Sequence, residues 1–421
     1  MKRILLGIIA LALAFLLLLN GRLHRPGGAG TVQAQLRYLE GALEYGAADE
    51  MQRLFPEGYV FTWALYGLAS ARLAGQLDAH DARRPHLLAE TRRALAAIHS
   101  DAGRAVFVRE MEPPYGVFHA SWALYVRAEY VRAAGRAKLP AAEIEKFTRE
   151  CDRFARALAS YGSPFLESYP EQVWPADTAP GIAALGIHDA VVAPRYRETI
   201  RRWVAEARAR QHPGLGALSH TAEPRSGRPT GVVRGESLAL MSRLLVDADP
   251  QFAREQYAVL RARFLDDVMG VPGFLEYPRG VHGEEDMDTG PLVFGFSGPA
   301  VVVGAAAARV HGDLSVANAL LGWVEVIGMP WQFGRERVYA GGKLPIGDAF
   351  IAWARTAPAA GPTLRTWEPM SPWWYLPFHA FSAAVGGLLV WWGLRIARTA
   401  RGSGSGKRRP GPIAAPLNAR R

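Results

Sequence analysis

The sequence predicts an all-α protein: an (α/α)6 toroid of six helical hairpins, flanked by an N-terminal and a C-terminal transmembrane helix. Three observations support this fold class. An apolar run lies near each end of the 421 residues, and between them a loop rich in Pro, Gly and aromatic residues leads six times into an apolar segment. Successive loops are 54 to 61 residues apart, which indicates an internal repeat. The residues that mark the six junctions are Gly58, Gly116, Asp177, Gly235, Thr289 and Gly347.

The N-terminal segment, residues 1–25, is expected to be a signal anchor. Residues 4–19 are uninterruptedly apolar and follow Lys2 and Arg3. A cleaved signal peptide has a similar composition and stays open as an alternative. However, no small-x-small cleavage site directly follows the run, and the nearest candidate, at residues 32–34, lies too far beyond it, which favours an uncleaved transmembrane helix.

The C-terminal segment carries a second predicted span, over residues 374–396. Residues 376–394 contain no formal charge, and tryptophans border them on both sides, as in interfacial aromatic belts. A linker, residues 357–373, precedes this span, and a basic, disordered tail, residues 397–421, follows it. Since basic residues favour the cytoplasmic side, both termini are expected there and the bulk of the chain on the other side.

The charge distribution excludes a nucleic-acid partner for the central domain. The net charge is +10, but eight basic and no acidic residues lie between Arg395 and Arg421. The rest of the chain is therefore nearly neutral, whereas a nucleic-acid footprint needs a basic face. The only cysteine, Cys151, lies in a strongly helical stretch and is expected to be an inert, packed thiol.

Residues 26–356 form the predicted toroid. Stretches such as 81–100 and 195–210 alternate apolar and charged residues at helical spacing, which predicts outer helices with one solvated face. The junction helices are apolar around most of their circumference, which predicts burial on all sides. Residues 298–310 are the one continuous β-like run, but they occur where an inner helix is needed. The loops that enter the inner helices should gather at one mouth, where a ligand site is expected.

Carboxylates and aromatic residues dominate the loops of this predicted mouth. Asp288 and Glu236 are the expected acid–base pair, with Asp177 as a third catalytic candidate. No metal and no cofactor is expected. The predicted substrate-binding residues are Trp174, Tyr169, His119, Tyr277, Asp286, Tyr339 and Asp348.

Structural roles remain open for several of these residues. Asp177 and Asp288 each precede a small or apolar run and could cap a helix. Glu236 could form a structural ion pair with Arg234, and His119 lies on an otherwise apolar face that suits a core histidine.

Two stretches resemble a known group of proteins. GFLEYPRGVHGEEDMDTGPLVFGFSGPAVVVGAAAARVHGD (residues 273–313), supplemented by VWPADTAPGIAAL (residues 173–185), is similar to membrane-bound bacterial proteins related to linalool dehydratase/isomerase and to the six-hairpin glycosidases. The resemblance implies the toroid with a pocket at its mouth, in a group that holds hydrolases, lyases and isomerases. The linalool enzyme is expected to use cysteines, whereas this chain has only Cys151.

Three functions are therefore expected, in order of preference. The first is a carbohydrate-active enzyme, a hydrolase or lyase, that acts on an envelope or exported glycan outside the inner membrane of a bacterial cell, in the periplasm. The second is an isoprenoid or lipid dehydratase–isomerase. The third is a non-catalytic module that binds a protein partner or holds together an envelope complex.

Overall fold

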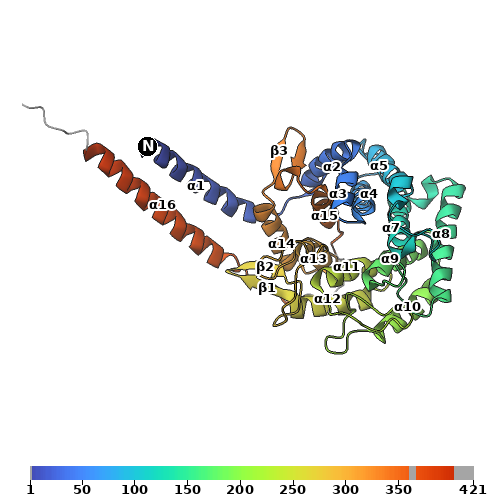
Figure 1. Cartoon of the computed structure of the whole chain (residues 1–421). Helices are drawn as coiled ribbons and strands as arrows, with labels where there is room; N and C mark the ends of the chain where they lie inside the picture. The colour runs from blue at the N-terminus through green and yellow to red at the C-terminus, as the bar shows by residue number, and fades with distance from the viewer. Residues whose placement is uncertain (1, 360–366, 403–421) are drawn as a thin grey trace, which may run out of the picture. The chain divides into compact units, whose positions relative to one another are not determined.

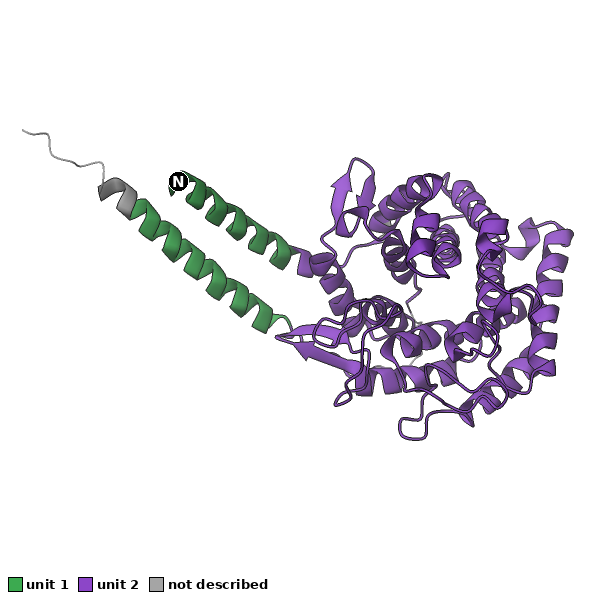
Figure 2. Cartoon of the chain, in the orientation of Figure 1, with its two compact units in different colours: residues 1–21, 375–421 green, residues 22–374 purple. Residues whose placement is uncertain are grey.

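The computed structural model describes residues 2–359 and 367–402, and the chain divides into two units (Figure 2). One unit comprises the chain up to residue 21 together with the chain from residue 375 onward, and the other comprises residues 22–374. Residues 360–366 of the expected linker lie outside the described residues. The same holds for residues 403–421 of the expected tail.

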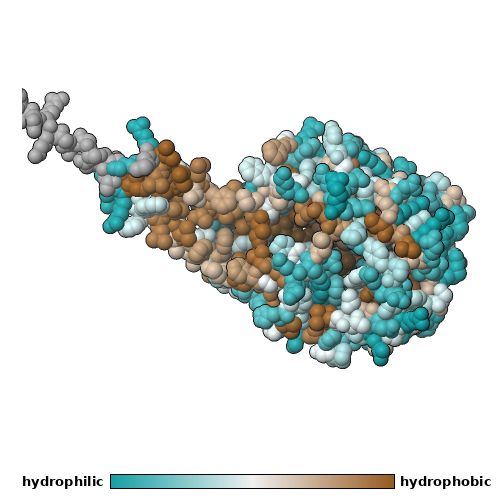
Figure 3. Space-filling view, viewed as in Figure 1, coloured by the Kyte–Doolittle hydropathy of each residue, from teal (hydrophilic) through white to brown (hydrophobic). Residues whose placement is uncertain are grey.

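The terminal unit consists of two long apolar helices, α1 (Lys2–Leu23) and α16 (Leu376–Gly402). Both are long and apolar enough to cross a membrane, and hydrophobic residues cover their surface (Figure 3). Small residues bring the two helices together: a Cβ placed on Gly393 would lie 3.7 Å from Ile9. A hydrogen bond between Asn20 and His379 also joins them. The predicted spans 1–25 and 374–396 each overlap one of these helices, but α16 continues to Gly402, so residues 397–402 of the expected disordered tail are helical.

The larger unit is predominantly helical, and its long helices alternate along the chain as the sequence predicts. The amphipathic segments form α2 (Ala29–Glu44), α5 (Arg84–Ile98), α8 (Ala141–Ser160), α10 (Arg197–Arg208) and α12 (Pro250–Phe264). The sixth expected amphipathic place is taken by α14 (Leu314–Ile327), which departs from the pattern because it is apolar and largely buried. The apolar segments form α4 (Gly58–Gln76), α7 (Gly116–Ala134), α9 (Pro175–Val191), α11 (Gly235–Leu244), α13 (Gly298–Val310) and α15 (Pro345–Arg355). Two short helices complete the set, α3 (Ala47–Leu54) and α6 (Asp101–Arg104).

The six apolar helices contact one another in a closed sequence. Helix α4 packs on α7, α7 on α9, α9 on α11, α11 on α13, α13 on α15, and α15 again on α4 (Figure 1). Trp122 of α7 and Trp353 of α15 are completely buried, with their ring centroids 6.4 Å apart. The amphipathic helices bury a single stripe, which in α8 comprises Phe147, Cys151, Phe154 and Leu158. This spacing is that of one face of a helix packed on a core.

Glycine allows two of these layers to approach closely. A Cβ on Gly67 of α4 would lie 2.8 Å from the Cβ of Ala94 in α5, closer than real side chains pack. The apolar helices are therefore rich in small residues because they have neighbours on every side.

The helix predicted from residues 298–310 is confirmed, but it begins only at Gly298, well after the junction marker Thr289. Ser297 caps it by accepting a hydrogen bond from the amide of Ala300. The preceding residues cannot start the helix because Phe294 and Gly295 have left-handed backbone angles, with φ of 55° and 82°.

Two antiparallel hairpins appear that the sequence pattern did not predict. They are formed by β1 (Leu265–Val268) with β2 (Val271–Phe274), and by β3 (Trp331–Phe333) with β4 (Glu336–Val338). Their strands of three or four residues are too short to give a period-2 signal.

Candidate functional site

Carboxyl groups from four separate segments lie close together at the N-terminal ends of the apolar helices. Glu57 directly precedes α4, Asp177 is in the first turn of α9, Glu236 is in the first turn of α11, and Asp288 is in the loop before α13. Their charges act on one another: Glu57 and Asp288 both raise the pKa of Asp177, and Glu57 raises that of Asp288. The three predicted catalytic residues are therefore neighbours.

Glu236 and Asp288 form the tightest part of this group. Ligand atoms of His220, Glu236 and Asp288 all lie within 4.8 Å of one another. The Glu236 side chain is 13% exposed, whereas Asp288 is exposed. Burial, reinforced by the charge of Glu276, raises the pKa of Glu236 well above its usual range. Although Asp288 is exposed as a residue, loss of water around its carboxyl group and the charge of Asp286 raise its pKa as well.

Arg234 organises the acidic groups around this pair. It donates from Nε to Oε1 of Glu276 at 2.6 Å, and from its two Nη atoms to Asp286 at 2.6 and 3.0 Å. One Nη also lies 3.6 Å from Glu236. Glu276 is completely buried, and burial raises its pKa to about 7 although Arg234 opposes the rise. Burial also raises the pKa of Asp286, but the hydrogen bonds from Arg234 outweigh this effect and hold it below its usual range.

His220 has a defined tautomer in this network. Its Nε2 lies 3.1 Å from Nη1 of Arg234, and its Nδ1 lies 2.7 Å from the hydroxyl of Ser237. An arginine only donates, so Nε2 accepts and Nδ1–H donates to Ser237. Burial and the charge of Arg234 lower the pKa of His220 to about 3, which keeps the ring neutral. The His220 Nδ1 lies 3.8 Å from Glu236 Oε1 and is the ring nitrogen on the side of the carboxylates; because it carries the ring proton in this network, it offers no lone pair to a cation as it stands.

Asp177 faces the same space from α9 and does not cap that helix. The helix begins at Pro175, and the Asp177 Oδ2 accepts a 2.5 Å hydrogen bond from the hydroxyl of Ser168. Burial raises its pKa to about 8, against the effect of Ser168. Within the described part of the chain, neither Asp177 nor Asp288 forms an ion pair with an arginine or lysine. The capping role left open for Asp288 is also absent, since Ser297 caps α13.

Aromatic side chains border the carboxyl groups. Tyr169 donates from its hydroxyl to Glu57 at 2.6 Å. Its ring is stacked on Phe107 at a centroid distance of 5.8 Å and meets the edge of Trp174 at 6.4 Å. Tyr277 donates to the backbone oxygen of Glu284 at 2.7 Å. Three of the predicted substrate-binding residues, Trp174, Tyr169 and Tyr277, therefore lie near the carboxyl groups.

The remaining predicted binding residues belong to other groups. His119 is buried, and its Nε2 lies 2.9 Å from the backbone oxygen of Ile98. It lines a cavity of about 130 Å³, where α7 and α8 meet, together with His99, Tyr115 and Glu150. This setting is that of a buried core histidine, the alternative that the sequence left open for His119.

Tyr339 and Asp348 lie in a second buried polar group. The Tyr339 hydroxyl donates to Glu325 at 2.6 Å, and its backbone amide donates to Asp348 Oδ1 at 3.0 Å. Arg355 hydrogen-bonds the Tyr339 hydroxyl at 2.5 Å and also binds Glu325. Burial raises the pKa of Asp348 to about 7, although the Tyr339 amide opposes the rise. Among the described contacts, none joins these two residues to Glu236 or Asp288.

Two functional candidates escaped the sequence reasoning, namely Glu276 and His220. The sequence does contain an indication of Glu276. It directly follows the apolar run VPGFL, so its carboxylate becomes buried when this run enters the core, and a buried charge needs a partner. His220 lies in the long connection between α10 and α11, and nothing in the surrounding sequence marks it.

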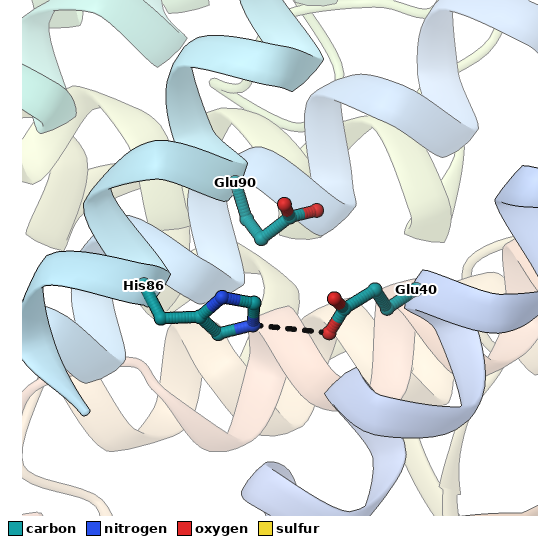
Figure 4. Close-up of side chains that lie close together, drawn as sticks. All are labelled: Glu40, His86 and Glu90. Atoms are coloured by element: carbon teal, nitrogen blue, oxygen red, sulfur yellow. Dashed lines mark hydrogen bonds and ion pairs between the residues drawn. The ribbon is translucent and has the colours of Figure 1, made fainter.

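A second cluster of ligand-type side chains lies between α2 and α5 (Figure 4). The His86 Nε2 is 3.1 Å from Glu40, and both lie close to Glu90. Glu90 Oε2 accepts hydrogen bonds from Tyr66 at 2.8 Å and from Arg93 at 3.3 Å. Since Arg93 already supplies a positive charge to this carboxylate, the cluster links two outer helices to α4 and needs no ion to do so.

Comparisons of the sequence assign no family. No family model matches the chain, and no curated protein matches it either. The resemblance carried by residues 173–185 and 273–313 stays a prediction, and function rests on the geometry around Glu236 and Asp288.

Proposed function

We propose that the chain is a membrane-anchored carbohydrate-active enzyme, a hydrolase or lyase that cleaves an envelope or exported glycan. One observation carries the proposal: Glu236 and Asp288 present carboxylate oxygens within 4.8 Å of each other, with the Glu236 side chain only 13% exposed and Asp288 exposed. Glycoside cleavage needs two such carboxyl groups in unlike environments, one that holds a proton and one that is ionised.

The fold that we propose for the larger unit is the (α/α)6 toroid. The closed sequence of contacts from α4 to α15 and back supports it, as does the alternation of amphipathic and apolar helices. In such an arrangement the first turns of α9 and α11, which carry Asp177 and Glu236, open toward one mouth.

In the proposed reaction Glu236 is the proton donor, because burial and the charge of Glu276 raise its pKa and so favour its protonated form. It donates its proton to the glycosidic oxygen as the bond to the anomeric carbon breaks, and the alcohol leaves. Asp288, the more solvated carboxylate, attacks the anomeric carbon. Water, deprotonated by Glu236, then displaces Asp288 and returns both groups to their starting states.

The separation favours retention of configuration. Carboxyl groups about 5–5.5 Å apart suit a covalent intermediate, whereas about 6.5–9.5 Å leaves room for a water molecule in an inverting reaction. Oxygens of Glu236 and Asp288 lie within 4.8 Å of each other, which leaves less room for an intervening water molecule than an inverting site has.

The supporting residues have distinct roles in this proposal. Tyr169 and Trp174 supply flat apolar faces for a sugar ring, and Asp177 offers a proton-bearing group to a hydroxyl. Arg234 is a positioning residue: it hydrogen-bonds Asp286 and Glu276, and it also forms the ion pair with Glu236, at 3.6 Å, that the sequence left open. We place the site on the periplasmic side of the inner membrane, because glycans occur there and α1 and α16 supply two apolar anchors.

A second candidate, isoprenoid or lipid dehydration and isomerisation, is favoured by a different observation. The loop that carries Asp288 also exposes Met287, Val293 and Phe294, and Phe294 is 75% exposed. An apolar rim beside a protonated carboxyl group suits an allylic alcohol, whose hydroxyl leaves as water after protonation. A purely binding role, the third expectation, would be favoured if arginines held all the carboxylates. Asp177 and Asp288 lack such partners within the described residues.

The test is cleavage by the full chain in nanodiscs. Envelope and exported polysaccharides are screened for release of reducing ends or unsaturated sugars, and prenyl alcohols are screened for loss of water. Asp288→Asn and Glu236→Gln should each abolish most of the activity, while Glu145→Gln on α8, whose side chain is 67% exposed, should not change it. Glycan cleavage that survives both site substitutions would overturn the proposal, as would turnover of prenyl alcohols alone.

A further inference from the structure

The β3–β4 hairpin displays two large aromatic side chains to the outside. Trp331 and Phe333 are 56% and 63% exposed. They are two residues apart on one strand, so they lie on the same face, and their rings are stacked at 6.4 Å with an interplanar angle of 12°. Exposed apolar surface of this kind commonly marks an interaction site.

The surroundings of the pair are mostly apolar and basic, with one exposed acidic residue, Glu336, opposite Phe333 in the hairpin. Ile327 at the end of α14 is exposed, as is Leu344 just before α15. Arg335 at the hairpin turn and Lys343 are exposed as well. Tryptophan beside basic and aliphatic side chains is the composition of a surface that rests in the headgroup region of a bilayer.

Hydrogen bonds hold the hairpin in place, with its aromatic rings outward. Arg37 of α2 donates from Nε to the backbone oxygen of Arg335 at 2.8 Å. The Tyr38 hydroxyl donates to the backbone oxygen of Gly342 at 3.2 Å. The backbone amide of Ala340 donates to the backbone oxygen of Gly328 at 2.8 Å. With three such attachments the hairpin cannot fold its aromatic rings back onto the domain.

The hairpin is also attached to the point at which α1 leaves its apolar run. Arg22 donates from Nη2 to the backbone oxygen of Pro330, directly before β3, at 2.8 Å. Leu23 lies against α14 at Gly322. A Cβ added to Gly322 would lie only 2.3 Å from the backbone oxygen of Leu23, so only glycine allows this close approach. The apolar run ends at Leu19, and three residues of helix span only about 4.5 Å.

We propose that the β3–β4 hairpin is a membrane-interface anchor. Trp331 and Phe333 insert at the boundary between headgroups and acyl chains, while Arg335 and Lys343 contact anionic headgroups. A bilayer that contains α1 begins within about one helical turn of Arg22, and it therefore meets a hairpin fixed to that residue. The anchor would hold the domain in one orientation against the lipid surface. This inference rests on the proposed membrane tether and is independent of the proposed chemistry.

The test uses the full chain in nanodiscs of phosphatidylcholine and phosphatidylglycerol. Cys151 is the only cysteine and is buried, so Cys151→Ala provides a background for single labelling sites. A fluorophore sensitive to polarity is attached after Phe333→Cys, and lipids with spin labels at defined acyl depth serve as quenchers. Leu11→Cys, within the apolar run of α1, reports insertion of that helix. Glu145→Cys on the solvated face of α8 reports an aqueous site.

We expect strong quenching at position 11, quenching by shallow labels at position 333, and none at position 145. Quenching at position 11 without any at position 333 overturns the anchor while the tether stands. Absence of quenching at both positions removes the tether and the anchor together. In either case, glycan cleavage by the same variants purified in detergent tests the proposed function separately.

Discussion

Arg234 holds Asp286 through two hydrogen bonds, of 2.6 and 3.0 Å, and this pair closes the network that surrounds Glu236. Arg234 is buried, and its Nε simultaneously holds the completely buried Glu276. One guanidinium thus offsets the charge of several carboxylates. Without it, burial and mutual repulsion would act unopposed on the site.

We predict that Arg234→Met strongly destabilises the larger unit. The substitution leaves Glu276 buried without its partner, and removal of one member of a buried pair costs about 3–5 kcal/mol. Urea unfolding of the full chain in detergent, followed by tryptophan fluorescence, measures the loss. Arg201→Met is the matched control, because Arg201 and Glu198 form a pair in which both side chains are more than 70% exposed. An equal loss in the two variants would contradict a special role for Arg234.

The activity should depend on pH as a bell-shaped curve. Asp288 must be ionised to attack, and Glu236 must keep its proton to donate it, so activity rises with ionisation of the first and falls with ionisation of the second. Burial raises the pKa of both groups, which moves the curve to higher pH than free carboxyl groups would allow.

Glu236→Gln tests this assignment through the shape of the curve. The variant should lose about 10²–10⁴-fold in rate, as expected for removal of a general acid, and it should lose the alkaline limb. Rates are measured between pH 4 and 10 on the best glycan substrate. A variant that keeps the alkaline limb would assign that limb to another group, with Asp177 as the first candidate.

Asp177 should make the fold less stable as the pH rises. Its folded-state pKa of about 8 is above the 3.8 of an aspartate in the unfolded chain, so the folded state binds the proton more tightly than the unfolded state. Between these two values only the folded state is protonated, and stability falls with increasing pH by at most about 1.4 kcal/mol per unit.

Asp177→Asn removes this dependence. The free energy of unfolding of the wild type relative to the variant should therefore decrease from pH 5 to pH 8 and become constant above that range. Urea midpoints of both proteins, collected in parallel buffers, give the comparison. A difference that stays constant with pH would mean that Asp177 titrates as an ordinary carboxyl group.

Cys151 should be inert in the folded protein. It is completely buried in the stripe of α8, and burial raises the pKa of its thiol well above the usual range. A chromogenic disulfide reagent should react with it only as fast as the chain unfolds, and stoichiometrically in urea. Rapid labelling of the native protein would contradict this burial and would also rule out Cys151→Ala as a silent background.

Several elements could be predicted from the sequence because their signals are local. The stripe of Phe147, Cys151 and Phe154 is a helical pattern within a few turns, and the apolar runs of α1 and α16 are continuous. The helix over residues 298–310 was predicted against its β-like composition, because the repeat required a helix there. Asp177, Glu236 and Asp288 lie at repeat junctions in the sequence, and they are neighbours in the structure.

Other features depend on partners that are distant in the chain. Tyr339 and Asp348 follow the same junction pattern, yet Glu325 and Arg355 draw them into a separate buried group. His220 received no local signal, because its role comes from Arg234 and Ser237.

The sequence by itself thus determined which segments are helical, which of them are apolar on all sides, and which junctions carry acidic groups. Only the tertiary structure decided which of those groups share a space, since Arg234 pairs with Glu276 and Asp286 across 42 and 52 residues. The physical reason is that helical periodicity repeats every few residues and can be read locally. Burial, charge pairing and the resulting pKa values arise only when distant segments exclude water together.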